Sequence, residues 1–188
     1  LLALTITFSM NAQMDDNSAN NNSAGTYAVA MGVGTAASGT ASAAMGGNTT
    51  ASGWYSTAMG SYSTASGNES TAMGYQTTAS GWYSTAMGSY STASADYSTS
   101  MGGNTTASGS HSTAMGKQTI ASDFASVVIG QYNSSGSSVT NNATSFSTSN
   151  TAFVIGNGVD SSNKSDAFKV MFNGDTTVSN DLTVSGDV

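Results

Sequence analysis

Residues 51–64 read ASGWYSTAMGSYST, and the same fourteen residues recur unchanged at 79–92. Around them, a Met-Gly or Ile-Gly pair returns every fourteen residues in eight copies between residues 23 and 134. A heptad array of helices is excluded, because Gly, Ser and Thr crowd every unit and no apolar seam exists. The fixed period therefore predicts an all-β fold, a β-solenoid in which each fourteen-residue unit forms one coil stacked on the next.

Two columns of the repeat carry its most regular residues. The glycine column consists of Gly32, Gly46, Gly60, Gly74, Gly88, Gly102, Gly116 and Gly130. The methionines that precede these glycines include Met45, Met59, Met73, Met87, Met101 and Met115. A glycine at one site of every unit indicates a backbone corner that penalises a Cβ atom. A second glycine column is interrupted by Ala95 and Asp123, so the corner that it marks is less strict.

Two glycine corners per unit leave two short strands in each coil. In the first strand, Ser56 and Ala58 share one face, while Thr57 and Met59 share the other. Neither face carries a charge in any copy. We therefore expect both faces to be buried, one inside the coil and one against another chain. A lone roll with so small a core would be marginal, which favours an oligomer.

The composition excludes several classes of partner and chemistry. The chain has 188 residues and a net charge of -7, which argues against nucleic acid or anionic lipid as a partner. It has no cysteine, so a disulfide framework and a thiolate metal site are excluded. His111 is the only histidine, and no nucleophile–base–carboxylate set accompanies it. We expect no enzyme activity, no cofactor and no metal site.

Two variable sites interrupt the otherwise regular unit with aromatic residues. The site after each A-S-G carries Trp54-Tyr55 and Trp82-Tyr83, and the other carries Tyr62, Tyr75, Tyr90 and Tyr132. Exposed aromatics on a rigid ladder are typical of a contact surface for protein or glycan. Alternatively, the rings stack on one another and shield the loop backbone, and the two roles can coexist. The candidate ligand contacts are Trp54, Tyr55, Trp82, Tyr83, Tyr97, His111, Tyr62 and Tyr90.

The segments that flank the repeat suggest a piece of a longer exported protein. Residues 1–13 have the character of the hydrophobic end of a secretory signal peptide, with a buried first strand as the alternative. The predicted organisation continues with a polar linker at 14–22, the eight-coil head at 23–134, an insertion with a degenerate ninth coil at 135–158, and a strand-rich neck or stalk at 159–188.

The unit S-T-A-M-G-x-x-x-x-A-S-G resembles the head repeat of trimeric autotransporter adhesins, the YadA-like head. That family's unit is S-V-A-I-G, and residues 127–130 (VVIG) and 153–156 (FVIG) come closest to it. The resemblance implies a left-handed parallel β-roll with three parallel chains around one axis. It also implies an extracellular head at the bacterial cell surface, attached to the outer membrane through an anchor outside this chain. Its expected partners are its own copies and a matrix protein or glycan on another surface.

Two other functions compete with a non-enzymatic adhesin head. A phage-type tail fibre is one, because residues 166–188 resemble strand-rich segments of bacterial and phage fibres. An ice-binding solenoid is the other, because threonine recurs in every coil. Flat ice-binding faces use T-x-T, whereas Thr49 and Thr50 are adjacent and so point to opposite faces. The adhesin head is the leading prediction.

Overall fold

The computed structural model describes residues 21–180, and within this range the fold is built of β-strands without a helix. Eight five-residue strands follow the Met-Gly and Ile-Gly column: β1 (Val29–Val33), β3 (Ala43–Gly47), β5 (Thr57–Ser61), β7 (Thr71–Tyr75), β9 (Thr85–Ser89), β11 (Thr99–Gly103), β13 (Thr113–Lys117) and β15 (Val127–Gln131). Seven two-residue strands alternate with them: β2 (Ala36–Ala37), β4 (Thr50–Ala51), β6 (Thr64–Ala65), β8 (Thr78–Ala79), β10 (Thr92–Ala93), β12 (Thr106–Ala107) and β14 (Ile120–Ala121). The predictions for residues 1–13 and 181–188 lie outside the described residues.

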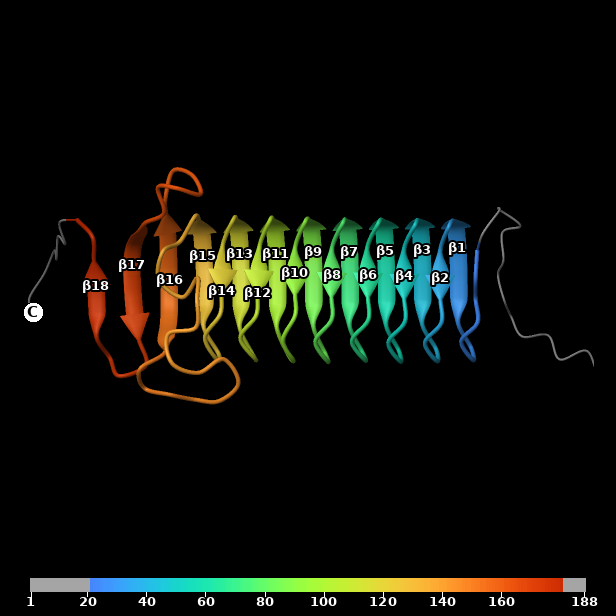
Figure 1. Cartoon of the computed structure of the whole chain (residues 1–188), viewed down its shortest axis with the longest axis horizontal. Coiled ribbons are helices and arrows are strands. Elements are labelled where there is room, and N and C mark those ends of the chain that lie inside the picture. The colour runs from blue at the N-terminus through green and yellow to red at the C-terminus, as the bar shows by residue number, and fades with distance from the viewer. Residues whose placement is uncertain (1–20, 181–188) are drawn as a thin grey trace, which may run out of the picture.

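The strands form two parallel sheets that run the length of the repeat (Figure 1). In the sheet of long strands, which we call the first sheet, Met59 pairs with Met73 and Met73 pairs with Met87. The short strands form the second sheet, with Thr64 paired to Thr78. Each strand thus pairs with the strand fourteen residues away, and the predicted parallel β-solenoid is confirmed.

The regular solenoid ends after β15, and three further strands extend the first sheet. Strand β16 (Thr151–Asn157) pairs parallel to β15, with Ile155 beside Ile129. Strands β17 (Asp166–Met171) and β18 (Thr176–Val178) then add antiparallel, and they lie at the opposite end of the sheet from β1 (Figure 1). The turn between β17 and β18 contains Asn173 and Gly174.

The glycine column lies where the backbones of successive coils are in close contact. All eight of its residues have φ between +94° and +132°, a region that side chains with a Cβ rarely adopt. A Cβ built on Gly60 would lie 2.1 Å from the carbonyl oxygen of Gly74. The second column is equally tight, since a Cβ on Gly53 would lie 2.0 Å from the Gly67 carbonyl oxygen, but its φ is ordinary. Ala95 and Asp123 in the second column therefore avoid the backbone penalty that a residue with a Cβ would face in the first column.

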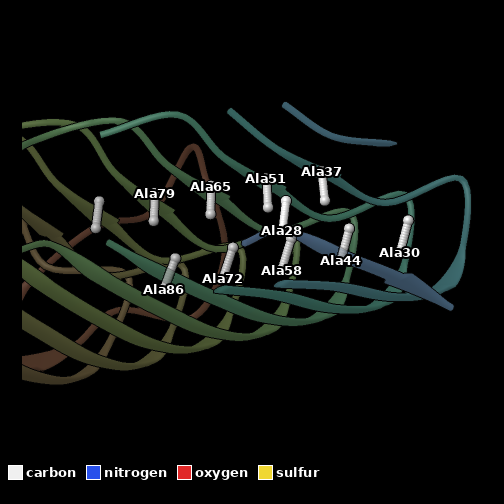
Figure 2. Close-up of a cluster of buried hydrophobic side chains, with 11 residues drawn as sticks. Ala28, Ala30, Ala37, Ala44, Ala51, Ala58, Ala65, Ala72, Ala79 and Ala86 are labelled. Atoms are coloured by element: carbon white, nitrogen blue, oxygen red, sulfur yellow. The ribbon is translucent and has the colours of Figure 1, made fainter. Parts of the chain in front are cut away.

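Alanine, not methionine, fills most of the interior of the coils, and Ser100 in β11 and Val128 in β15 take the same inward position. Ala58 in the first sheet and Ala65 in the second are both fully buried, and Figure 2 shows that these alanines form rows along the solenoid. Met59 is only half-buried, because it alternates with Ala58 and so lies on the outer face of β5. The expectation that one strand face packs inside the coil is therefore met by the alanine face. The Thr57 and Met59 face remains on the outside of the single chain.

Buried hydroxyl groups share the interior with alanine. The Ser56 hydroxyl donates to the Gly53 carbonyl oxygen at 2.7 Å, and the Thr77 hydroxyl donates to the Ser63 oxygen at 2.9 Å. Such partners matter because a buried polar group without one costs about 1–3 kcal/mol. With small side chains hydrogen-bonded to the backbone corners, the two sheets can lie close together without a large apolar core.

One buried carboxylate secures the irregular insertion between β15 and β16. Asp123 is fully buried and accepts hydrogen bonds from the backbone amides of Thr140 at 2.6 Å and Thr151 at 2.8 Å. The insertion is held further by Asn150, whose side-chain oxygen accepts from the Asn142 amide at 2.8 Å. From its position in the second glycine column, Asp123 therefore fixes the insertion against the last regular coil.

Within residues 21–180, no helix has the length and apolar character needed to cross a bilayer.

Candidate functional site on the turn columns

Two turns of each coil hold a residue in the left-handed backbone conformation. The first turn column consists of Tyr27, Ala41, Tyr55, Glu69, Tyr83, Tyr97, His111 and Ala125, with φ from 54° to 63°. The second turn column contains Asn48, Tyr62, Gln76, Tyr90, Asn104, Gln118 and Tyr132, with φ from 45° to 57°. Each such conformation costs about 1–3 kcal/mol unless its surroundings hold it in place. The columns are therefore a constrained part of the fold rather than loose loops.

A ladder of backbone hydrogen bonds holds the turns in this conformation. The Tyr83 amide donates to the Asn68 carbonyl oxygen at 2.9 Å, and the Tyr97 amide donates to the Trp82 carbonyl oxygen at 2.8 Å. The Tyr62 amide donates in the same way to the Gly47 carbonyl oxygen at 2.8 Å. Because each turn is bonded to the coil before it, the side chains of a column are spaced by the coil repeat of about 4.8 Å.

This spacing lets the rings of the first turn column stack. Tyr83 and Tyr97 lie parallel with ring centroids 4.9 Å apart, and Tyr97 and His111 stack at 4.7 Å. Phe124 continues the series beyond His111, at 5.2 Å and a tilt of 55°. Three of the predicted contact residues thus form one continuous stack. The geometry therefore shows that these three rings stack on one another.

The two tryptophans lie outside that stack. Trp54 is 62% exposed and Trp82 is 58% exposed, and neither ring contacts another ring within residues 21–180. The backbone amide of Trp54 donates to the Asn68 side-chain oxygen at 3.0 Å, and that of Trp82 donates to an Asp96 carboxylate oxygen at 2.9 Å. Asn68 and Asp96 stand at the equivalent position of the next coil and fix the backbone of each tryptophan, while the indole rings and Tyr55, also 62% exposed, face solvent.

A second aromatic group forms beside the second turn column. Tyr75 meets Tyr62 edge-on at 6.4 Å and Tyr90 at 5.3 Å. Tyr75 and Tyr62 occupy the two adjacent positions of this variable site: Tyr75 ends strand β7 and pairs with Ser61 and Ser89, whereas Tyr62 lies in the turn. From this neighbouring position its ring bridges two tyrosines that lie two coils apart.

Two tyrosines of these groups have shifted pKa values. The negative charge of Glu69, together with a hydrogen bond to its carboxylate, raises the pKa of Tyr83 above its ordinary value. The pKa of Tyr75 is raised mainly by a hydrogen bond with Tyr90 and by the charge of that neighbour. Both phenols are therefore neutral at physiological pH and present hydrogen-bonding hydroxyl groups at the rim of an apolar surface.

The side chains of the two turn columns provide groups that suit ligand binding. Aromatic faces suit the C–H surfaces of sugars and apolar side chains, and the phenol and indole groups add hydrogen bonds. Within the described range no three His, Asp or Glu residues come together as a metal site would require. His111 lies in the aromatic stack between Tyr97 and Phe124.

A second feature, a pocket at the end of the solenoid, was not predicted from the sequence. It measures about 450 Å³ and contains the side chains of Lys164 and Lys169. The signal that could have revealed it is the rarity of basic residues, because the whole chain has only three Lys and Arg in total. What could not be read from the sequence is that the insertion and the β17–β18 hairpin bring two of the three to one place.

Comparison with known families identifies the repeat. The family model of the YadA head domain repeat, which describes two copies, matches residues 23–48, 37–63, 65–91, 83–105, 93–119 and 107–133. Together these matches cover more than half of the chain and extend from β1 to β15 of the regular solenoid. No curated protein matches the sequence.

Proposed function

This chain belongs to the YadA head family, and from that premise we propose that it is the head of a trimeric adhesin at a bacterial cell surface. Heads of this family are associated with autotransporters at the cell surface, where a stiff solenoid presents binding residues away from the cell. The observation that supports the proposal is that the solenoid combines two regular features. The first is an outer strand face whose threonine and methionine columns carry no charge and suit assembly, and the second is a column of exposed aromatic side chains suited to contact.

The outer face of the first sheet supports a parallel homotrimer. Its central column consists of Met31, Met45, Met59, Met73, Met87, Met101, Met115, Ile129 and Ile155, all half-buried in the single chain. Thr57, Thr71 and their equivalents form an uncharged column beside it. A contiguous apolar stripe of this length is rarely left in water by a soluble monomer. Three chains packed by this face around one axis cover it.

The tryptophan pairs support ligand contact outside that interface. Trp54-Tyr55 and Trp82-Tyr83 are two coils apart, or about 9.6 Å along the solenoid. Three chains present six such pairs on one rod. Individually weak contacts with a matrix protein or glycan then add through avidity, provided that the target carries several sites within reach.

Substitution of the tryptophan pairs tests the contact role. The variant Trp54→Ser, Tyr55→Ala, Trp82→Ser, Tyr83→Ala should keep its circular dichroism spectrum and lose most attachment to matrix-coated and glycan-coated surfaces. The control, Val139→Ser with Val159→Ser, removes exposed apolar side chains from elsewhere and should attach normally. Unchanged attachment of the first variant would show that these aromatic side chains do not contact the ligand.

The assembly itself is tested by sedimentation of the full chain. A trimer is expected over a wide range of concentration. A folded monomer whose mass does not change with concentration would contradict the proposal.

The outward hydroxyl groups of the second sheet support ice binding as a second candidate function. Thr49 is buried and Thr50 faces outward, as their adjacency predicts, but Ser52 also faces outward, so the coils that contain β4, β6, β8 and β10 present Thr-x-Ser on one face. The exposed serines Ser52, Ser66, Ser80 and Ser94 run beside the outward threonines Thr50, Thr64, Thr78 and Thr92. These are two hydroxyl columns with a regular spacing of about 4.8 Å. Thermal hysteresis that disappears in Thr64→Lys, Thr78→Lys would establish this function, and its absence in the parent chain would exclude it.

A further inference from the structure

The pocket at the end of the solenoid is built by segments that are distant in the sequence. Ser134 follows β15, Asn157 ends β16, and Lys164 precedes β17, which contains Lys169. Across the hairpin, Lys169 pairs with Thr177 of β18. The pocket of about 450 Å³ falls within the range of small-ligand sites, which is about 300–1,000 Å³.

The charge of the pocket is opposite to that of the chain. The chain carries ten Asp and Glu against three Lys and Arg, yet two of the three basic residues, Lys164 and Lys169, line this one hollow. Neither ammonium group forms an ion pair or a hydrogen bond with the rest of residues 21–180. Two cations without carboxylate partners, in a chain with so many carboxylates, indicate a site for an external anion.

The single carboxylate of the pocket is occupied by structural hydrogen bonds. One oxygen of Asp166 accepts from the Ser134 amide at 2.9 Å. The other accepts from the Ser134 hydroxyl at 2.8 Å and from the Ser135 amide at 2.8 Å. Asp166 thereby fixes the serine wall of the pocket, and two ammonium groups against one carboxylate leave the hollow with net positive charge.

Other hydrogen bonds hold the polar rim in place before any ligand arrives. The Ser165 hydroxyl donates to the Asn157 side-chain oxygen at 2.7 Å, and the Ser179 hydroxyl donates to the Asp166 carbonyl oxygen. In all, five hydroxyl and two amide side chains line the pocket beside the charged groups. A rim fixed in advance lowers the ordering cost of binding.

We propose that this pocket binds an acidic saccharide, a sugar unit that carries a carboxylate or a sulfate group. The ammonium groups of Lys164 and Lys169 receive the acid, and the hydroxyl and amide side chains receive the sugar hydroxyls. Aromatic side chains are absent from the lining, so recognition relies on charge and hydrogen bonds. The site goes beyond the proposed adhesive role, because it shares no residue with the aromatic turn columns and can bind whether or not they do.

The test measures binding of defined probes to the full chain by isothermal titration calorimetry at low and high salt. The probes are N-acetylneuraminic acid and glucuronic acid for the carboxylate, a sulfated disaccharide for the sulfate, and lactose and inorganic sulfate as references. We expect at least one acidic saccharide to bind, at least tenfold more tightly than lactose, with weaker binding at high salt. The more tightly bound of the two acidic classes identifies the acid group.

Matched variants assign the binding to the pocket. Lys164→Gln with Lys169→Gln removes both charges at similar size and should weaken binding at least tenfold. Lys117→Gln removes the third lysine, which lies over the Tyr132 ring at 5.4 Å in another part of the chain, and should bind like the parent. The proposal is overturned if no acidic saccharide binds, if inorganic sulfate alone binds, or if the double variant binds as tightly as the Lys117 control. Loss of surface attachment by the tryptophan variant with intact saccharide binding would separate the two sites.

Discussion

A Cβ atom on Gly74 would lie 1.9 Å from the carbonyl oxygen of Gly88, its equivalent in the next coil. The same relationship holds between Gly60 and Gly74, at 2.1 Å. Along this edge the stacking distance is therefore set by backbone touching backbone, with no room for a side chain. One residue type at one position of the repeat thus determines how closely the coils can approach.

Gly74→Ala should lower the free energy of unfolding by more than the backbone conformation alone accounts for. Its φ of +130° costs about 1–3 kcal/mol for a residue with a Cβ, and the contact with Gly88 adds to that. The matched control is Gly103→Ala, where a Cβ would have no neighbour within 4 Å. Urea unfolding at equal protein concentration compares the two. Equal losses would refute the backbone-contact explanation.

Enlarging the alanine interior should also be costly. Ala72 is fully buried between the sheets, so Ala72→Leu overpacks the coil and should cost about 1–3 kcal/mol. Met73→Leu, one residue further on the outer face, conserves volume and should cost less than about 1.5 kcal/mol. Thermal unfolding of both variants measures the difference. A larger loss from Met73→Leu would mean that methionine carries the core.

Charges on the methionine column should prevent assembly. Met59→Asp with Met87→Asp places carboxylates on the outer face of the first sheet, where an unpaired buried charge is strongly unfavourable in a trimer interface. Thr64→Asp with Thr92→Asp places the same charges on the outer face of the second sheet. Sedimentation should show dissociation of the methionine variant alone. Dissociation of the threonine variant alone would place the interface on the other sheet.

Glu69→Gln should lower the pKa of Tyr83 toward its ordinary value, because the charge of Glu69 is the main cause of the upward shift. In the parent chain the folded state holds the phenol proton more tightly than the unfolded state does. The contribution of Tyr83 to the free energy of unfolding is present below the pKa that this residue has in the unfolded state. It is lost as the pH rises through the pKa of Tyr83 in the folded state. Alkaline titration of the Tyr83 ring by NMR measures the change. Tyr75 is the internal control, because its shift comes from Tyr90 and should persist.

The aromatic site was only partly predictable. The fourteen-residue spacing indicated that Tyr83, Tyr97 and His111 share a column, and it left both stacking and ligand contact open. Their parallel rings and the isolation of Trp54 and Trp82 depend on side-chain rotamers, which the repeat does not encode. The repeat also left open that, within one variable site, Tyr75 ends a strand while Tyr62 lies in a turn.

The sequence by itself determined that each fourteen-residue unit forms one coil of a solenoid. A glycine every fourteen residues permits only a backbone corner at that position, and eight copies in register leave stacking as the one way to bury their faces. Only the tertiary structure decided which face of the first-sheet strands points into the coil. Ala58 and Met59 are both uncharged, so hydrophobicity does not separate them, but two sheets joined by such short corners leave space for alanine and none for methionine. The pocket, too, exists only in the folded chain, because Ser134, Lys169 and Thr177 meet through the pairing of β16, β17 and β18 rather than through any repeat.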